Sequence, residues 1–208
     1  MLKSLLRSIW RAAKKTLTYI GQGIEYIFTG RSEYEVIGED FPFEKVENTV
    51  QAKILLREAQ EYLQHRFAIT VKQPLVVELF TSFSSWQVAF YQFSGLVGRY
   101  RPCELKKEKV HLVYVLKGLS REKCKGVMVH EVVHAFQREQ GILAHDKMLR
   151  EGMSRWLEYK FLLSEGEQKS AQRLKIAKSL LYGRGLRKVL EMEKSMGEKK
   201  LLEYLKNL

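Results

Sequence analysis

The chain has 208 residues, of which 45% are hydrophobic and 29% are charged, a balance that fits a folded domain and excludes wholesale disorder. Its formal net charge of +12 favours acidic or anionic partners, but no nucleic-acid-binding motif accompanies it, so nucleic acid is not an expected partner. No apolar run reaches the roughly 18 residues of a membrane span, and Lys14 and Lys15 interrupt the apolar core that a secretory signal needs.

Residues 2–20 repeat apolar side chains at helical spacing and carry basic residues on the opposite face. The apolar positions are Leu2, Leu5, Leu6, Ile9, Trp10, Ala13, Leu17 and Ile20, and the basic ones are Lys3, Arg7, Arg11, Lys14 and Lys15. Such a helix can pack on the protein body, bind an anionic membrane surface or act as a detachable pro-segment. We expect residues 1–40 to form this helix and a linker, with an anionic membrane as a candidate partner of residues 1–28.

The remainder, residues 41–208, predicts one domain of the α+β class. The predicted elements are a helix at 44–66, strands at 67–71, 75–80 and 110–116, a helix from Ser120 to about Gln140, and helices at 148–163, 167–181, 184–196 and 198–207. Segment 86–93 is either a further strand or an aromatic insertion, and a turn after it leads into another strand. Ser120 is the expected N-cap of its helix, and Gly141 is the expected stop.

The sequence HEVVH in the middle of the chain predicts a zinc site. His130 and His134 are four residues apart in a predicted helix, so both imidazoles face the same side and can share one metal ion. Glu131 lies beside them and can take a proton from a water molecule that zinc activates. Apolar neighbours on this side of the helix argue against two solvated histidines, because buried imidazoles need partners.

A zinc site needs a third protein ligand. Gln140 occupies the position at which the extended metzincin pattern has a histidine, so that pattern is disfavoured. Two candidates remain: His145, in a predicted loop eleven residues after His134, and Glu151, seventeen residues after it. We favour Glu151, because a helix packed through its apolar face holds a ligand better than a loop does. The alternative is that Glu151 only faces the dipole of its helix.

These residues resemble a known family. HEVVH followed by Glu151 and Gly152 is similar to the gluzincins, zinc peptidases that bind the metal through two histidines and a downstream glutamate. The stretch from VHLVYVL to LREGMSRWLEY resembles the minigluzincins and the peptidase domain of the plant ubiquitin-activated organ-size regulators. The resemblance covers roughly residues 75–206. It implies a zincin-like fold with a small mixed sheet, an active-site helix, a helical C-terminal lobe and an edge strand around residues 83–103 that binds an extended peptide.

A second resemblance concerns the segment that begins YGRGL. It is similar to the YxxG segment of the aminopeptidase branch of the gluzincins, whose tyrosine stabilises the oxyanion; the matching residue is Tyr182. Alternatively, Tyr182 only packs at a helix start. The GAMEN motif of aminopeptidases is absent, so aminopeptidase specificity does not carry over. Arg155 replaces the aspartate that supports a zinc-binding histidine in thermolysin-like members, so this support must come from elsewhere.

Taken together, the motifs predict a hydrolase: a zinc metalloprotease, specifically an endopeptidase, that acts on peptide or protein substrates. The alternative is a latent or non-catalytic zincin-fold protein whose basic N-terminal helix binds a membrane surface or a partner. Cys103 and Cys124 form no CxxC pair, which favours a reducing compartment, although a single bridge between them stays open. We therefore expect a cytoplasmic location, with membrane association as an option.

Overall fold

The strand β3 (Glu108–Leu116) forms the centre of the fold, as its β-branched and aromatic residues predict. It pairs in parallel with β1 (Leu75–Phe80) and antiparallel with β2 (Gly98–Leu105), which gives a mixed sheet of order β1-β3-β2. The computed structural model describes residues 44–81, 97–105, 107–142, 146–177 and 182–207. The predicted helix at 2–20 with its membrane-binding face, the segment 86–93 and His145 lie outside these residues.

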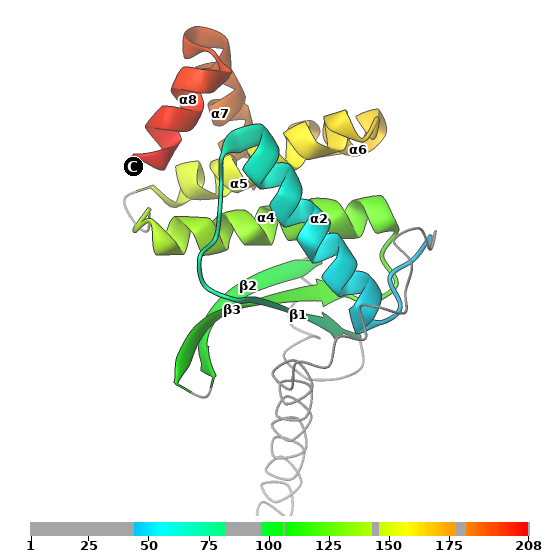
Figure 1. The fold of residues 1–208 in the computed structure, drawn as a ribbon. Coiled ribbons are helices and arrows are strands. Elements are labelled where there is room, and N and C mark those ends of the chain that lie inside the picture. Colours follow the sequence, from blue (N-terminus) through cyan, green and yellow to red (C-terminus); the bar gives the residue numbers. More distant parts are fainter. Residues whose placement is uncertain (1–43, 82–96, 106, 143–145, 178–181, 208) are drawn as a thin grey trace, which may run out of the picture. The chain divides into compact units, whose positions relative to one another are not determined.

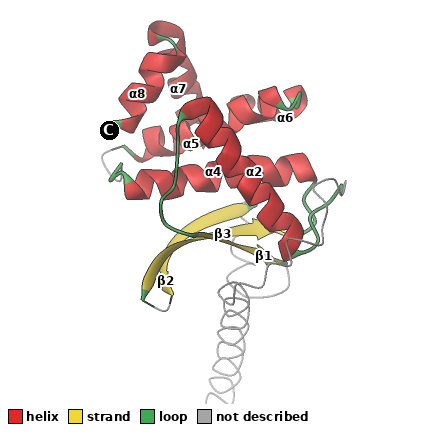
Figure 2. Ribbon diagram, in the orientation of Figure 1, coloured by secondary structure: helices red, strands yellow, loops and turns green. Residues whose placement is uncertain are grey.

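Helices make up most of the described chain. They are α2 (Thr49–Phe67), α4 (Arg121–Glu139), α5 (Lys147–Ser164), α6 (Gln168–Ile176), α7 (Tyr182–Met196) and α8 (Glu198–Lys206). In Figures 1 and 2, α2 and α4 lie on one face of the sheet, and the later helices lie beyond them. The predicted α+β class is therefore confirmed for the described residues. None of the helices described is long and apolar enough to cross a membrane.

The predicted strand at 67–71 is wrong. Phe67 is instead the last residue of α2, and Ala68 ends that helix in the left-handed region, with φ 49° and its N–H bonded to Gln64 O at 3.0 Å. Ile69 N–H then bonds back to Leu63 O at 3.1 Å, so this stretch closes the helix. The β-forming residues are used to bury apolar surface, because Phe67 and Ile69 are only 3% and 2% exposed. Tertiary packing has overridden local propensity.

The start of α2 also differs from the prediction. Residues 44–47 are extended rather than helical, because Val46 exchanges backbone hydrogen bonds with Leu119 and Gly118, at 2.9 and 2.8 Å. The helix begins after Asn48, whose side chain accepts from Gln51 N while Gln51 Oε1 accepts from Asn48 N. This reciprocal cap satisfies two backbone donors that the first turn leaves open.

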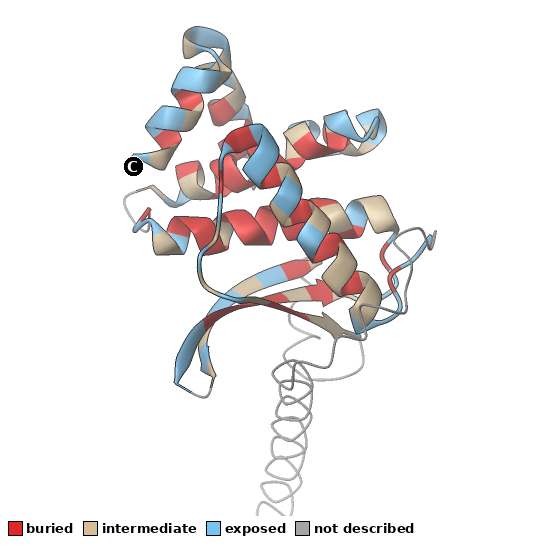
Figure 3. Cartoon of the chain, viewed as in Figure 1, coloured by how far each residue is buried: buried red, intermediate tan, exposed pale blue. Residues whose placement is uncertain are grey.

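The buried core lies around α4 and α5, which are red along much of their length in Figure 3. α4 packs against the sheet, α2 and α5, so it is apolar around most of its circumference. Ser120 accepts from Lys123 N and caps α4 as predicted, and Gly141 follows the helix with φ +74°. Asp146 caps α5 by accepting from Met148 N and Leu149 N, at 2.8 and 3.1 Å.

Two glycines allow α5 and α7 to cross with their backbones in close approach. A Cβ atom added to Gly152 would lie 2.7 Å from Gly185 O, and one added to Gly185 would lie 2.6 Å from Met148 O. No side chain fits at either position without moving a helix. The contact fixes the distance between Glu151, which precedes Gly152, and Tyr182, which begins α7.

Replacing Gly152 with alanine should lower the free energy of unfolding by about 1–3 kcal/mol, because the new methyl group presses on the backbone of α7. Urea denaturation measures this change. Gly126→Ala is the matched control, since Gly126 also lies inside a buried helix but its added Cβ would meet Leu162 Cδ2 at 3.4 Å, an ordinary contact. Helix propensity predicts equal or higher stability for that control. Equal stability of the two variants would contradict the close crossing.

Candidate metal centre

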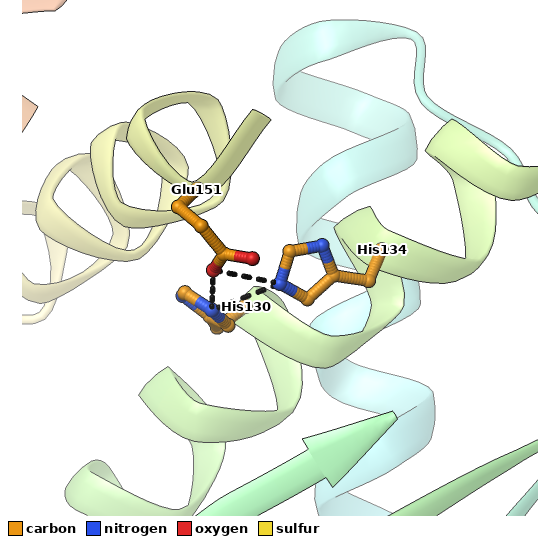
Figure 4. Close-up of side chains that lie close together, drawn as sticks. All are labelled: His130, His134 and Glu151. Atoms are coloured by element: carbon orange, nitrogen blue, oxygen red, sulfur yellow. Dashed lines mark hydrogen bonds and ion pairs between the residues drawn. The ribbon is translucent and has the colours of Figure 1, made fainter. Parts of the chain in front are cut away.

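Three side chains with metal-binding atoms meet where α4 packs against α5 (Figure 4). His130 and His134 come from successive turns of α4, and Glu151 comes from the N-terminal part of α5. The Nε2 atoms of the histidines are 3.1 Å apart. Glu151 Oε2 lies 3.6 Å from His130 Nε2 and 3.2 Å from His134 Nε2. The structure thus brings together the three residues expected as metal ligands.

The spacing of these donor atoms fits a zinc ion. With bonds of about 2.0–2.1 Å, a tetrahedral ion holds its ligand atoms about 3.3–3.4 Å apart. The observed separations of 3.1, 3.2 and 3.6 Å lie on both sides of that value. Two imidazoles and a carboxylate also form a known ligand set of catalytic zinc sites, in which the fourth position stays open. In the part of the chain that the structure describes, no second group of such residues converges in this way.

Gln137 fixes the tautomer of His134. Its Nε2 donates to the carbonyl oxygen of Arg150 at 3.0 Å, so its Oε1 is the atom that faces His134. Because Oε1 can only accept, the Nδ1–H of His134 donates to it, at 2.8 Å. The proton on Nδ1 leaves the lone pair of Nε2 free for a metal ion.

Glu158 lies beside the other imidazole, at ion-pair distance rather than in hydrogen-bond geometry. Its Oε2 lies 3.2 Å from His130 Nδ1, which favours a proton on Nδ1 and directs Nε2 towards Glu151. Arg155 donates to the same carboxylate oxygen at 2.7 Å. The support that the sequence left unassigned therefore comes from Glu158, with Arg155 as its partner. The signal in the sequence was the spacing, because Glu158 follows Glu151 by two helical turns on one face of α5.

The cluster is buried and strongly coupled. Burial by itself lowers the pKa of His130, but the carboxylates of Glu151 and Glu158 outweigh it and raise that pKa to about 9. Burial raises the pKa of the Glu151 carboxyl, yet contacts with His130 and His134 outweigh it and leave the pKa well below the usual value. For Glu131, burial dominates and raises the pKa. A carboxylate shifted in this direction is a better proton acceptor than an exposed one.

A cleft of about 450 Å³ opens onto these residues, between β2 and the helices α4 and α5. Glu131 lines it beside the histidines, as the role of general base requires. β2 approaches α4 closely at Gly98, where an added Cβ would overlap Val127 Cγ1 and lie 3.1 Å from Glu131 Oε1. Gly98 therefore leaves the room that the Glu131 carboxylate occupies, a role that sequence reasoning did not find.

Tyr182 begins α7 and also lines the cleft. Its ring centroid lies 6.3 Å from that of His130, and the guanidinium carbon of Arg155 lies 4.9 Å from the tyrosine centroid. Burial raises the pKa of Tyr182, so the phenol keeps its proton at neutral pH and can act as a hydrogen-bond donor. The structure therefore brings Tyr182 to the same cavity as the other four predicted site residues.

The wall of the cleft formed by β2 and β3 is held by a buried polar network. Tyr100 lines the cleft, and its hydroxyl donates to His111 Nδ1 at 2.9 Å, while His111 Nε2–H donates to Glu139 Oε1 at 3.0 Å. Glu139 also accepts from the backbone N–H groups of Lys72 and Gln73, at 2.8 and 2.7 Å. The network ties the sheet to the C-terminal end of α4, one turn beyond the metal centre.

Comparisons with known proteins do not extend these observations: no protein-family model, curated protein or solved structure matches the chain. The features of the chain that bear on function are therefore structural. They are the spacing of three donor atoms, the two oriented imidazoles and the buried carboxylate of Glu131, all in one cleft.

Glu139→Gln should lower the stability at pH 7 by about 1–3 kcal/mol, because an amide cannot accept from all three donors that Glu139 serves. Burial raises the pKa of Glu139, but these hydrogen bonds outweigh it and lower it below its ordinary value. The stabilisation is therefore present above the unfolded value of about 4.3 and is lost as pH falls through the folded pKa. Urea titrations from pH 7 to 3 should show the difference between wild type and variant shrinking in acid. Glu104→Gln, an exposed change on β2, should have no such effect.

Proposed function

We propose that the chain is a zinc-dependent metallopeptidase of zincin-like fold that hydrolyses internal peptide bonds. One observation carries the proposal: His130, His134 and Glu151 present donor atoms at the edge lengths of a zinc tetrahedron, in the cleft that also holds Glu131. The resemblance to gluzincins supports the same assignment from the sequence side. A structural zinc site would not need a buried carboxylate next to its histidines.

Zinc bound by these residues would supply Lewis acidity, which lowers the pKa of water and polarises a substrate carbonyl. The chain's own groups do the rest. Glu131 accepts the proton of the attacking water and passes it to the leaving amine. Tyr182 donates a hydrogen bond to the negative charge that develops on the carbonyl oxygen. Glu158 and Gln137 hold the two imidazoles in the orientation that binding requires.

The edge of β2 suits an extended substrate. Among the described strands, β2 pairs only with β3, so it is an edge strand of the described sheet and the candidate for strand addition beside the cleft. The predicted peptide-binding edge around residues 83–103 overlaps β2 from Gly98 to Cys103, while residues 83–96 lie outside the described chain. A substrate bound along this edge continues past both ends of the metal centre, as an endopeptidase requires.

The alternative function is that of a latent or non-catalytic zincin. The intact Glu131 argues against loss of catalysis, because a site that only holds zinc has no use for it. Latency is compatible with every residue of the site, and zinc binding without cleavage would favour it. The basic helix at 2–20, proposed to bind a membrane or partner, would then be the region to remove first.

The first test compares zinc content and cleavage of casein for the wild type, Glu131→Gln and Glu151→Ala. We expect about one zinc per wild-type chain, chelator-sensitive cleavage, full zinc but no cleavage for Glu131→Gln, and loss of zinc for Glu151→Ala. His145→Ala is the control for the third ligand. If that variant loses zinc while Glu151→Ala keeps it, the assigned ligand set is wrong. No zinc in the wild type after loading would refute the proposal as a whole.

Tyr182→Phe should reduce kcat by about 10²–10³-fold at unchanged zinc content, because it removes one hydrogen bond to the transition state. The effect should appear in kcat rather than in KM, since the interaction strengthens only as charge develops. Tyr204→Phe, an exposed change on α8, provides the control. A wild-type kcat for Tyr182→Phe would assign this tyrosine a packing role alone.

A further inference from the structure

The two ends of the cleft carry different charges. α4 and α5 run antiparallel, since His130 contacts Glu158 near one end and Gln137 donates to the carbonyl of Arg150 near the other. Arg138 lies one turn after His134 on the same face of α4. Arg150 directly precedes Glu151 on α5. Both arginines line the cleft, at the end towards the C-terminus of α4.

The described residues around these two arginines neutralise their charges only in part. No carboxylate in the described residues lies within ion-pair distance of Arg138, which is exposed. Arg150 has a single ion-pair contact, of 3.4 Å, from Nη2 to Glu151 Oε1, and its buried Nε has no hydrogen-bond partner among the described atoms. The charge of Arg138 is therefore available to a ligand, and Arg150 keeps an unpartnered N–H donor beside its contact with Glu151.

At the opposite end of the cleft, the arginine is paired closely with a carboxylate. Arg155 donates to Glu158 at 2.7 Å, and its guanidinium lies over the ring of Tyr182. That end is therefore close to neutral. At the Arg138 end, the nearest carboxylate of the cleft is Glu151, whose Oε2 faces the histidines. A bound zinc ion would add further positive charge, so the field along the cleft favours an anion at this end only.

We propose that Arg138 and Arg150 form a subsite for a carboxylate of the substrate. This inference rests on the proposed peptidase function and adds a substrate class to it: peptides with a carboxylate close to the scissile bond. Arg138 lies about 6 Å beyond His134 along α4, the rise of four helical residues. An extended peptide advances about 3.3 Å per residue. The carboxylate therefore belongs to the first or second residue from the scissile bond, on one side of it.

Two sources can supply that carboxylate, an acidic side chain or the free C-terminus of a short peptide. Matched fluorogenic peptides separate them. One set places Glu or Gln at each of the two positions on either side of the scissile bond, with both ends blocked. A second set varies only a free or amidated C-terminus. The zinc-loaded wild type, Arg138→Gln and Arg150→Gln are compared, with Arg173→Gln as the control, because Arg173 is an exposed arginine of α6 that does not line the cleft.

We expect the wild type to prefer the carboxylate over its amide by about 10-fold or more in kcat/KM at one position, the size of a charge-assisted bidentate contact. The ratio of kcat/KM for the carboxylate and the amide peptide should fall towards one in Arg138→Gln and Arg150→Gln, and it should stay unchanged in Arg173→Gln. Arg138→Lys should retain part of the preference for the carboxylate, because the positive charge remains. The planar guanidinium that can contact both carboxylate oxygens is lost. Binding of the same peptides to zinc-loaded Glu131→Gln, followed by fluorescence anisotropy, gives a readout that does not depend on turnover.

The outcomes separate the two proposals. Cleavage without a preference for the carboxylate, or a preference that survives both arginine variants, would overturn the subsite and leave the peptidase intact. Absence of cleavage with carboxylate-selective binding would overturn catalysis and retain the subsite. Absence of both would refute both. Zinc content and thermal unfolding of each variant are measured alongside, and if Arg150→Gln disturbs the metal through Glu151, Arg138→Gln decides.

Discussion

The buried charges between α4 and α5 constrain the rest of the structure. Glu131, Glu151 and Glu158 are at most 9% exposed, and a carboxylate removed from water needs a compensating positive charge. His130 can supply it as an imidazolium, which is why its pKa is raised to about 9. A divalent cation competes for the same place, because a nitrogen that binds a metal must be unprotonated. The carboxylates that favour the proton on His130 therefore also make the cavity attractive to zinc.

Close backbone approach is the second condition for the site. Glu151 comes near the histidines only because α5 packs tightly, and Gly152 lets α7 lie against it with Tyr182 at the cleft. Gly98 does the same for β2, which would otherwise collide with Val127 and crowd Glu131. Gly152, which follows the proposed ligand Glu151, thus has a physical role: it lets the helix with the proposed ligand pack against the helix with the proposed oxyanion donor.

The parts of the site that could be predicted from the sequence are those set by one helix. His130 and His134 share a face of α4 at any tertiary placement, because four residues make one turn. Glu151 needed only the further assumption that α5 packs on α4. Gln137 and Glu158 escaped prediction because their contacts depend on the antiparallel register of the two helices. The wrong prediction of a strand at 67–71 has a related cause. Burial of Phe67 and Ile69, rather than their β propensity, determined the conformation of this segment.

Arg155 occupies the position at which the thermolysin-like pattern has an aspartate, and the contacts of α5 differ accordingly. The carboxylate beside His130 is that of Glu158, one turn after Arg155 on α5, and Arg155 pairs with the same carboxylate. The two arginines of α5 therefore differ: Arg155 pairs closely with Glu158 at 2.7 Å, whereas Arg150 has a longer contact of 3.4 Å with Glu151 and lines the cleft beside Arg138. The arginine that pairs with Glu158 and the arginines beside Glu151 therefore line different parts of the cleft. The same constraint that positions the imidazole thus sets the direction in which a charged substrate would bind.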